Sequence, residues 1–137
     1  MVIRYRRAPE LDAFVLDIVR RLGMTHLDTG RIVCVRSKGS STDRILARIH
    51  GLPRIWQFAL GAGASYVIEV ISESYDHLSE VEREKVLIHE LLHIPTSFGG
   101  GFRHHRDWVD RQRVERTYRM LRESRSRDSR TLASGTD

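Results

Sequence analysis

The sequence predicts an α+β domain in which helices flank a small mixed or antiparallel sheet of about three strands. Two long segments carry apolar residues at helical spacing, and short β-branched runs bounded by glycine, proline and polar residues lie between them. The chain has 137 residues, of which 40% are hydrophobic and 30% charged, as in a single globular domain. We expect this domain to span residues 1–123 and a disordered tail to span residues 124–137.

Residues 9–22 are predicted to form the first helix. Pro9 fits the first turn of a helix, and Gly23 fits its end. The apolar residues of this segment recur at positions i, i+3, i+4 and i+7, and they are Leu11, Phe14, Val15, Ile18, Val19 and Leu22. We expect this helix to have a structural role.

Residues 31–36 are predicted to form a strand, because they contain a short apolar run rich in β-branched residues. A short helix is expected next. Thr42 or Asp43 would cap it, and it would run through Ile49, where glycine and proline follow.

Residues 54–60 and 65–71 are two further apolar runs with β-branched and aromatic residues. Residues 61–64 contain two glycines, so we expect a β-hairpin with its turn at this position. Either strand of this hairpin is a candidate for the edge of the sheet, where an extended peptide could bind by β-augmentation.

Residues 79–93 are predicted to form the second long helix. Ser79 and Glu82 match the S-x-x-E pattern of a capping box, which marks a helix start. Pro95 disfavours helical backbone at the residue before it, so the helix should end at about His93 or one residue later. A glycine-rich loop follows, and a final helix is expected from His105 to about Glu123.

The composition restricts the kind of protein this sequence encodes. Cys34 is the only cysteine, which excludes an intramolecular disulfide and a cysteine-based zinc site. Apolar runs are too short for a membrane span, and no apolar segment follows the N-terminal arginines, so we expect a cytoplasmic protein with no membrane partner. The net charge of +5 is compatible with nucleic-acid association, although a solvated helix face and a charged tail explain it more simply.

The second long helix contains the segment His89-Glu90-Leu91-Leu92-His93. Histidines four residues apart lie on one face of a helix, so both imidazoles can bind one metal ion. Glu90 lies about a quarter turn away, where its carboxylate can sit beside a metal-activated water. This pattern predicts a zinc-dependent peptidase, with Zn²⁺ as cofactor, Glu90 as general base and a protein or peptide as substrate.

A catalytic zinc site needs a third protein ligand and one open position. The ligand must come from beyond Pro95, because the chain turns back there. We prefer His105 as this ligand, with His104 second; the carboxylates that could replace them are Asp107, Asp110 and Glu115. The transition state also needs a hydrogen-bond donor, for which the candidates are Arg103, His104, Tyr75 and Tyr118.

Three runs around this site, Ile88–Pro95, Phe98–Gly100 and Arg103–His105, resemble the phage-type metallopeptidases, a group of small predicted enzymes also found in archaea. Segments within residues 47–56 and 66–70 resemble the same group, so the resemblance covers roughly residues 8–120. It implies a minimal zincin fold akin to SprT-like proteases: an N-terminal helix, a small sheet, an active-site helix and a C-terminal helix. It also implies zinc on His89, His93 and His105, with Glu90 catalytic. SprT-like relatives often act on DNA-associated proteins, which agrees with the arginine excess.

Other functions fit parts of the pattern. One is a zinc-dependent hydrolase that acts on nucleic acid, although endoribonucleases that hold zinc with three histidines have no glutamate directly after the first one. Another is a catalytically silent binding module that keeps its metal for stability. If the protein is a peptidase, residues 124–137 could lie in the cleft as an autoinhibitory segment, and truncation after Glu123 would then raise activity.

Overall fold

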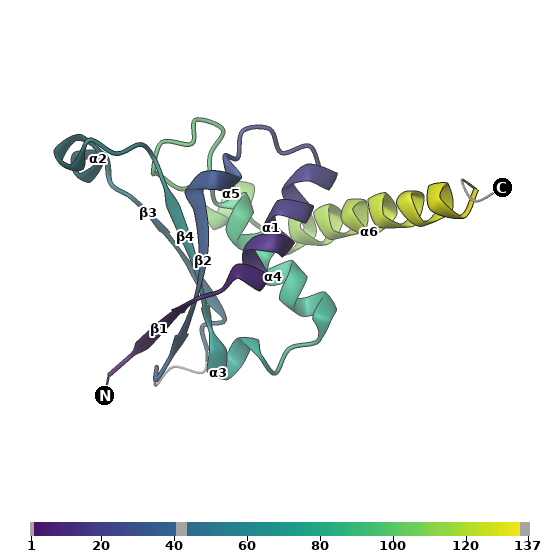
Figure 1. Cartoon of the computed structure of the whole chain (residues 1–137), viewed down its shortest axis with the longest axis horizontal. Coiled ribbons are helices and arrows are strands. Elements are labelled where there is room, and N and C mark those ends of the chain that lie inside the picture. Colours follow the sequence, from purple (N-terminus) through teal and green to yellow (C-terminus); the bar gives the residue numbers. More distant parts are fainter. Residues whose placement is uncertain (1, 41–43, 135–137) are drawn as a thin grey trace.

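A four-stranded mixed sheet forms one layer of the fold (Figure 1). The structure is a computed structural model that describes residues 2–40 and 44–134, with only the backbone described at residues 106, 107 and 131–134. The strands are β1 (Arg4–Arg7), β2 (Ile32–Lys38), β3 (Ala47–Gly51) and β4 (Tyr66–Ile71), and their order in the sheet is β1-β2-β4-β3. β2 pairs with β4 in parallel, while the β1–β2 and β3–β4 pairs are antiparallel. β3 therefore lies at one edge of the sheet.

Two long helices, α1 (Pro9–Arg21) and α4 (Glu80–Leu92), cover one face of this sheet, and a third, α6 (Arg111–Ser134), packs against both of them (Figure 1). The shorter helices are η1 (Thr29–Arg31), α2 (Arg54–Leu60), α3 (Ser72–Tyr75) and α5 (His105–Trp108). The core between the layers is built from buried residues of β4 and of the long helices, such as Ile18, Ile68, Val70, Ile88, Leu91 and Leu121. The predicted α+β class is confirmed. Within the described chain, no helix combines the length and the apolar character that crossing a membrane requires.

The prediction of a helix that runs through Ile49 is wrong, because residues 47–51 form strand β3. Its expected caps, Thr42 and Asp43, lie outside the described residues. Ile49 is paired with Ile68 of β4, and the antiparallel ladder continues along the strand. A short apolar segment of this kind fits either state, and here the hydrogen bonds of a neighbouring strand decide the outcome.

The strand expected at residues 54–60 is also wrong, because this segment forms helix α2. The carbonyl of Pro53 accepts hydrogen bonds from the backbone amides of Trp56 and Gln57, both at 3.0 Å. Gly61 ends the helix in the left-handed conformation, with φ of 63°. Proline and glycine thus act as helix boundaries, and β4 pairs with β3 rather than with residues 54–60.

The expected final helix starts at His105 as α5, is interrupted after Trp108, and continues as α6 to a later end than expected. The chain turns at Val109 and Asp110 between α5 and α6, and the Asp110 carboxylate accepts a hydrogen bond from the Arg113 amide at 2.7 Å. Helix α6 then continues through Ser134, so residues 124–134 are helical where the sequence predicted a disordered tail. Residues 135–137 of that predicted tail lie outside the described residues.

Ion pairs attach the distal half of α6 to the rest of the fold. The Arg125 guanidinium lies 2.7 Å from the carboxylate of Glu84 on α4, which is buried, and 3.0 Å from the partly exposed carboxylate of Asp17 on α1. Burial opposes ionisation of Asp17, but its hydrogen bonds to Arg125 and Arg21 lower its pKa overall. Beyond this cluster, α6 leads away from the sheet (Figure 1).

Candidate metal centre

Three histidine side chains converge where α4 ends and α5 begins. His89 and His93 lie one helical turn apart, with their Nε2 atoms 3.3 Å from each other. The Nε2 atom of His105 lies 3.2 Å from that of His89 and 3.1 Å from that of His93. Among the described residues, these three side chains form a group that could hold a metal ion.

The spacing of these nitrogens matches the requirements of zinc. Zinc–nitrogen bonds of about 2.0–2.1 Å with tetrahedral angles place neighbouring ligand nitrogens about 3.3 Å apart. The distances here are 3.1–3.3 Å, and three donors leave the fourth corner of a tetrahedron free. The donor set therefore fits a three-histidine site with an open position.

The local structure fixes which nitrogen of His93 faces this centre. Its Nδ1 atom lies 2.9 Å from the carbonyl oxygen of Arg103, so the Nδ1–H donates to that carbonyl. The Nε2 lone pair then remains available for a metal. In return, the Arg103 amide donates to the His93 carbonyl at 2.7 Å, which fastens the loop to the end of α4.

Burial favours the neutral form of His89 and His93. Burial, together with the neighbouring imidazoles His93 and His105, lowers the pKa of His89 to about 4. Burial lowers the pKa of His93 as well, against the opposing effect of its hydrogen bond to Arg103. Metal ions bind the neutral form of imidazole, so neither His89 nor His93 has to lose a proton near neutral pH before it can bind one.

Glu90 supplies a carboxyl group beside the three histidines. It is only 6% exposed, although it lines two adjoining cavities of about 490 and 420 Å³. Burial raises its pKa to about 7, because the charged form loses hydration there. A carboxyl group with this pKa can both accept and release a proton near neutral pH.

The edge strand forms one wall of both cavities. Residues 44–47 line the larger cavity, and residues 47–49 line the smaller one. His89 and Glu90 border both, so they lie where the two cavities meet. The result is a cleft that passes the three histidines along β3, which within the described residues pairs only with β4.

Tyr66 holds the glycine-rich loop that leads to His105. Its hydroxyl donates to the Gly101 carbonyl and accepts from the Gly100 amide, both at 2.8 Å. Gly100 has φ of 101°, and a Cβ atom at this position would collide with the Leu52 carbonyl. Sequence reasoning did not identify Tyr66, because a tyrosine at the start of a strand carries no signal of this role.

Gln57 and Gly51 fix the same loop from the β3–α2 side. The Gln57 amide donates to the carbonyls of Leu52 at 2.8 Å and Gly99 at 3.0 Å. A Cβ atom on Gly51 would collide with the Gly100 carbonyl, so the two backbones can approach this closely only with glycine at position 51. The loop position therefore depends on contacts with the sheet as well as on its own sequence.

Replacing Tyr66 with phenylalanine is expected to lower the free energy of unfolding by about 1–3 kcal/mol, because two backbone groups of the loop lose their hydrogen-bond partner. Urea denaturation followed by circular dichroism measures this change. Tyr75→Phe is the matched control, since Tyr75 is equally buried but its hydroxyl makes only a long contact of 3.4 Å to the Arg83 carbonyl. Equal losses in both variants would contradict the assigned role of the Tyr66 hydroxyl.

The structure separates the candidates for the third ligand. His105 joins the histidine group. His104 lies outside this group and directly precedes α5, where its carbonyl accepts a hydrogen bond from the Trp108 amide at 3.2 Å. Among the alternative carboxylates, Asp110 caps α6 and Glu115 pairs with Lys85 at 2.9 Å. The side chain of the third alternative carboxylate, at position 107, lies outside the described part of the structure.

The candidate hydrogen-bond donors are likewise distributed over the molecule. Arg103 and His104 line the smaller cavity, although the Arg103 guanidinium stacks on Trp108 at 4.6 Å. Tyr75 lies in α3 and borders neither cavity. Tyr118 is buried under the Lys85 amino group, which lies 5.2 Å from its ring. Of the four candidates, only Arg103 and His104 are close enough to the cleft to serve.

Comparison with known proteins adds one finding. Residues 3–127 match the model of a family described as putative phage metallopeptidase. Neither the curated proteins nor the solved structures give a match. The matched region contains the sheet, the long helices up to residue 127 and all three histidines.

Proposed function

Because the chain belongs to the family described as putative phage metallopeptidase, we propose that it is a zinc-dependent peptidase. The observation that carries this proposal is the convergence of three Nε2 atoms within 3.3 Å of one another beside the buried carboxyl group of Glu90. Metal-dependent hydrolysis needs these two components together, a site with an open position and an adjacent group that moves protons.

His89, His93 and His105 would hold the ion in this proposal. A bound zinc supplies Lewis acidity, which polarises a substrate carbonyl and makes water more acidic. Glu90 acts as general base: its carboxylate takes a proton from the attacking water and then delivers it to the leaving amine. Arg103 or His104 would donate a hydrogen bond to the oxygen that becomes negative.

The edge strand gives the substrate a binding mode. An extended peptide can pair with the free side of β3 and so lie in the cleft along the three histidines. This mode replaces the expectation that residues 54–60 or 65–71 form the edge, since the first segment is helical and β4 lies between β2 and β3. Backbone pairing would provide affinity, and the two cavities would receive side chains.

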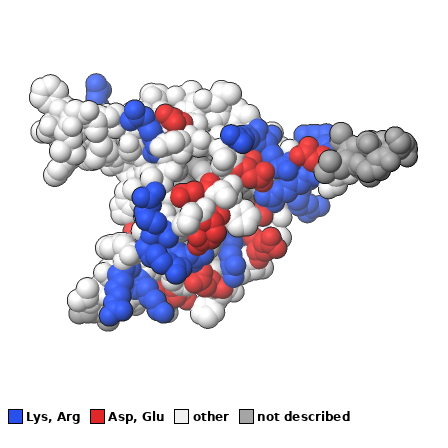
Figure 2. Space-filling model, viewed as in Figure 1, with Lys and Arg blue, Asp and Glu red and all other residues white. Residues whose placement is uncertain are grey.

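The surface charge supports a peptide substrate better than a nucleic acid. On the face seen in Figure 2, basic side chains alternate with acidic ones and do not form one continuous basic surface. Several arginines, including Arg21, Arg36 and Arg125, are neutralised by carboxylates. A nucleic-acid hydrolase would instead need a continuous stretch of cations available for phosphates.

The test is cleavage of an unfolded protein, β-casein, by the purified chain loaded with one equivalent of zinc. We expect fragments to appear, to disappear after dialysis against a chelator, and to return when zinc is added back. Single-stranded DNA and RNA are incubated in parallel. If nucleic acid is cleaved while casein stays intact, the function is that of a nuclease rather than a peptidase. If neither substrate is cleaved, the metal-stabilised binding module is the function that remains.

A further inference from the structure

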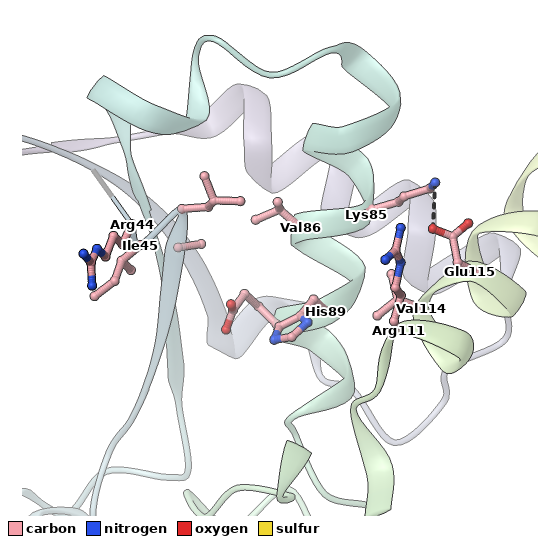
Figure 3. A pocket seen from close by; sticks show the side chains of 11 residues that line it. Arg44, Ile45, Lys85, Val86, His89, Arg111, Val114 and Glu115 are labelled. Atoms are coloured by element: carbon pink, nitrogen blue, oxygen red, sulfur yellow. Dashed lines mark hydrogen bonds and ion pairs between the residues drawn. The ribbon is translucent and has the colours of Figure 1, made fainter. Parts of the chain in front are cut away.

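The larger cavity beside His89 has a distinctive lining (Figure 3). Apolar side chains from three elements contribute to it: Ile45 ahead of β3, Val86 of α4 and Val114 of α6. With a volume of about 490 Å³, it can accommodate any one amino-acid side chain. Because this cavity adjoins Glu90 and one of the three histidines, a peptide bound along β3 would place a side chain here.

Basic groups dominate the rim of this cavity. Lys85 and Glu115 form an ion pair of 2.9 Å, so their charges largely cancel. Arg44 and Arg111 line opposite sides of the cavity (Figure 3). None of the ion pairs formed among the described residues includes Arg111.

The position of Arg111 at the start of α6 is unfavourable for a cation. It is the first residue of a 24-residue helix whose first turn contains no acidic residue; the Asp110 carboxylate just ahead of the helix accepts a hydrogen bond from the Arg113 amide. The amino-terminal end of a helix is its positive end, so a guanidinium group there is repelled and an anion is attracted. A carboxylate bound at this position would gain from both the arginine and the helix.

We propose that this cavity binds an acidic side chain of the substrate, next to the peptide bond that is cleaved. The methylene groups of a glutamate would lie against Val86 and Val114, and its carboxylate would reach Arg111. Guanidinium groups suit this role, because their planar N–H groups match the two oxygens of a carboxylate. This inference rests on the proposed peptidase function and assigns the substrate class to it.

The test compares pools of fluorescence-quenched peptides that have glutamate, glutamine or lysine fixed at one position, with random residues elsewhere. The zinc-loaded protein is expected to cleave glutamate peptides about tenfold faster, in kcat/KM, than lysine peptides. Arg111→Glu should remove or reverse this preference. Arg119→Glu changes the net charge equally at an exposed position of α6 outside the cavity lining, and should keep the preference.

A binding measurement keeps this inference separate from the proposed activity. Fluorescence anisotropy of the same peptides on the zinc-loaded Glu90→Gln variant reports recognition without cleavage. If the unmodified protein cleaves all pools equally, the proposed preference for acidic side chains is wrong, but the proposed peptidase function stands. If it cleaves no pool, the proposed peptidase function is wrong. In that case, equal affinity of the variant for glutamate and lysine peptides would also overturn the proposed binding of acidic side chains.

Discussion

Replacing Glu90 with glutamine is expected to slow peptide cleavage by about 10²–10⁴-fold while the protein still binds one zinc ion. Glutamine has nearly the same shape as glutamate, but its amide cannot take a proton from water. Glu90 does not belong to the histidine group, so the metal site should keep its three donors. Initial rates of β-casein cleavage and the zinc content of the purified variant are the measurements.

Glu115→Gln is the matched control for this experiment. It makes the same chemical change in the same cleft, but Glu115 lies on α6 and pairs with Lys85, outside the histidine group. We expect its cleavage rate to stay within about threefold of the unmodified protein, as for loss of a partly exposed ion pair. If Glu90→Gln keeps full activity, or if it loses zinc, Glu90 is not the general base proposed here.

Replacing His105 with alanine is expected to lower the affinity for zinc by at least about a hundredfold, since second-shell changes alone cost up to that factor. Two histidines would remain, and the open side of the site would widen. Competition with a chromophoric chelator measures the affinity directly. Cleavage should fall in the same variant and recover only partly when excess zinc is added.

His104→Ala provides the control at the adjacent position. The His104 side chain is exposed, and its structural hydrogen bond to Trp108 uses the backbone carbonyl, which alanine retains. Zinc affinity should therefore remain close to that of the unmodified protein. The reverse pattern, with zinc retained in His105→Ala and lost in His104→Ala, would transfer the proposed ligand role to His104.

The helix that carries the first two histidines could be predicted from sequence because local signals determine it. Ser79 caps it through a hydrogen bond from the Glu82 amide at 3.2 Å, and helical geometry then places His89 and His93 one turn apart. The choice between His104 and His105 could not be made in this way. It depends on the path of the loop, in which Phe98 has φ of 48° and Gly100 has φ of 101°.

Residues 47–60 were predicted least well, because their secondary structure also depends on neighbouring segments. Residues 47–51 and 54–60 are short and apolar, and their lengths allow either a strand or a helix. Pairing with β4 makes the first a strand, while Pro53 and Gly61 bound the second as a helix. One wall of the cleft depends on this exchange, and neither of the two segments that the sequence offered as the sheet edge lies there.

The close backbone approach of Gly51 and Gly100 has a thermodynamic consequence. Gly51 ends the strand proposed to receive the substrate, and Gly100 belongs to the loop that leads to His105. A peptide that pairs with β3 and shifts this contact must change the affinity for zinc. By linkage, zinc must then change the affinity for that peptide by the same factor. Substrate and metal would thus be coupled ligands of one structural unit.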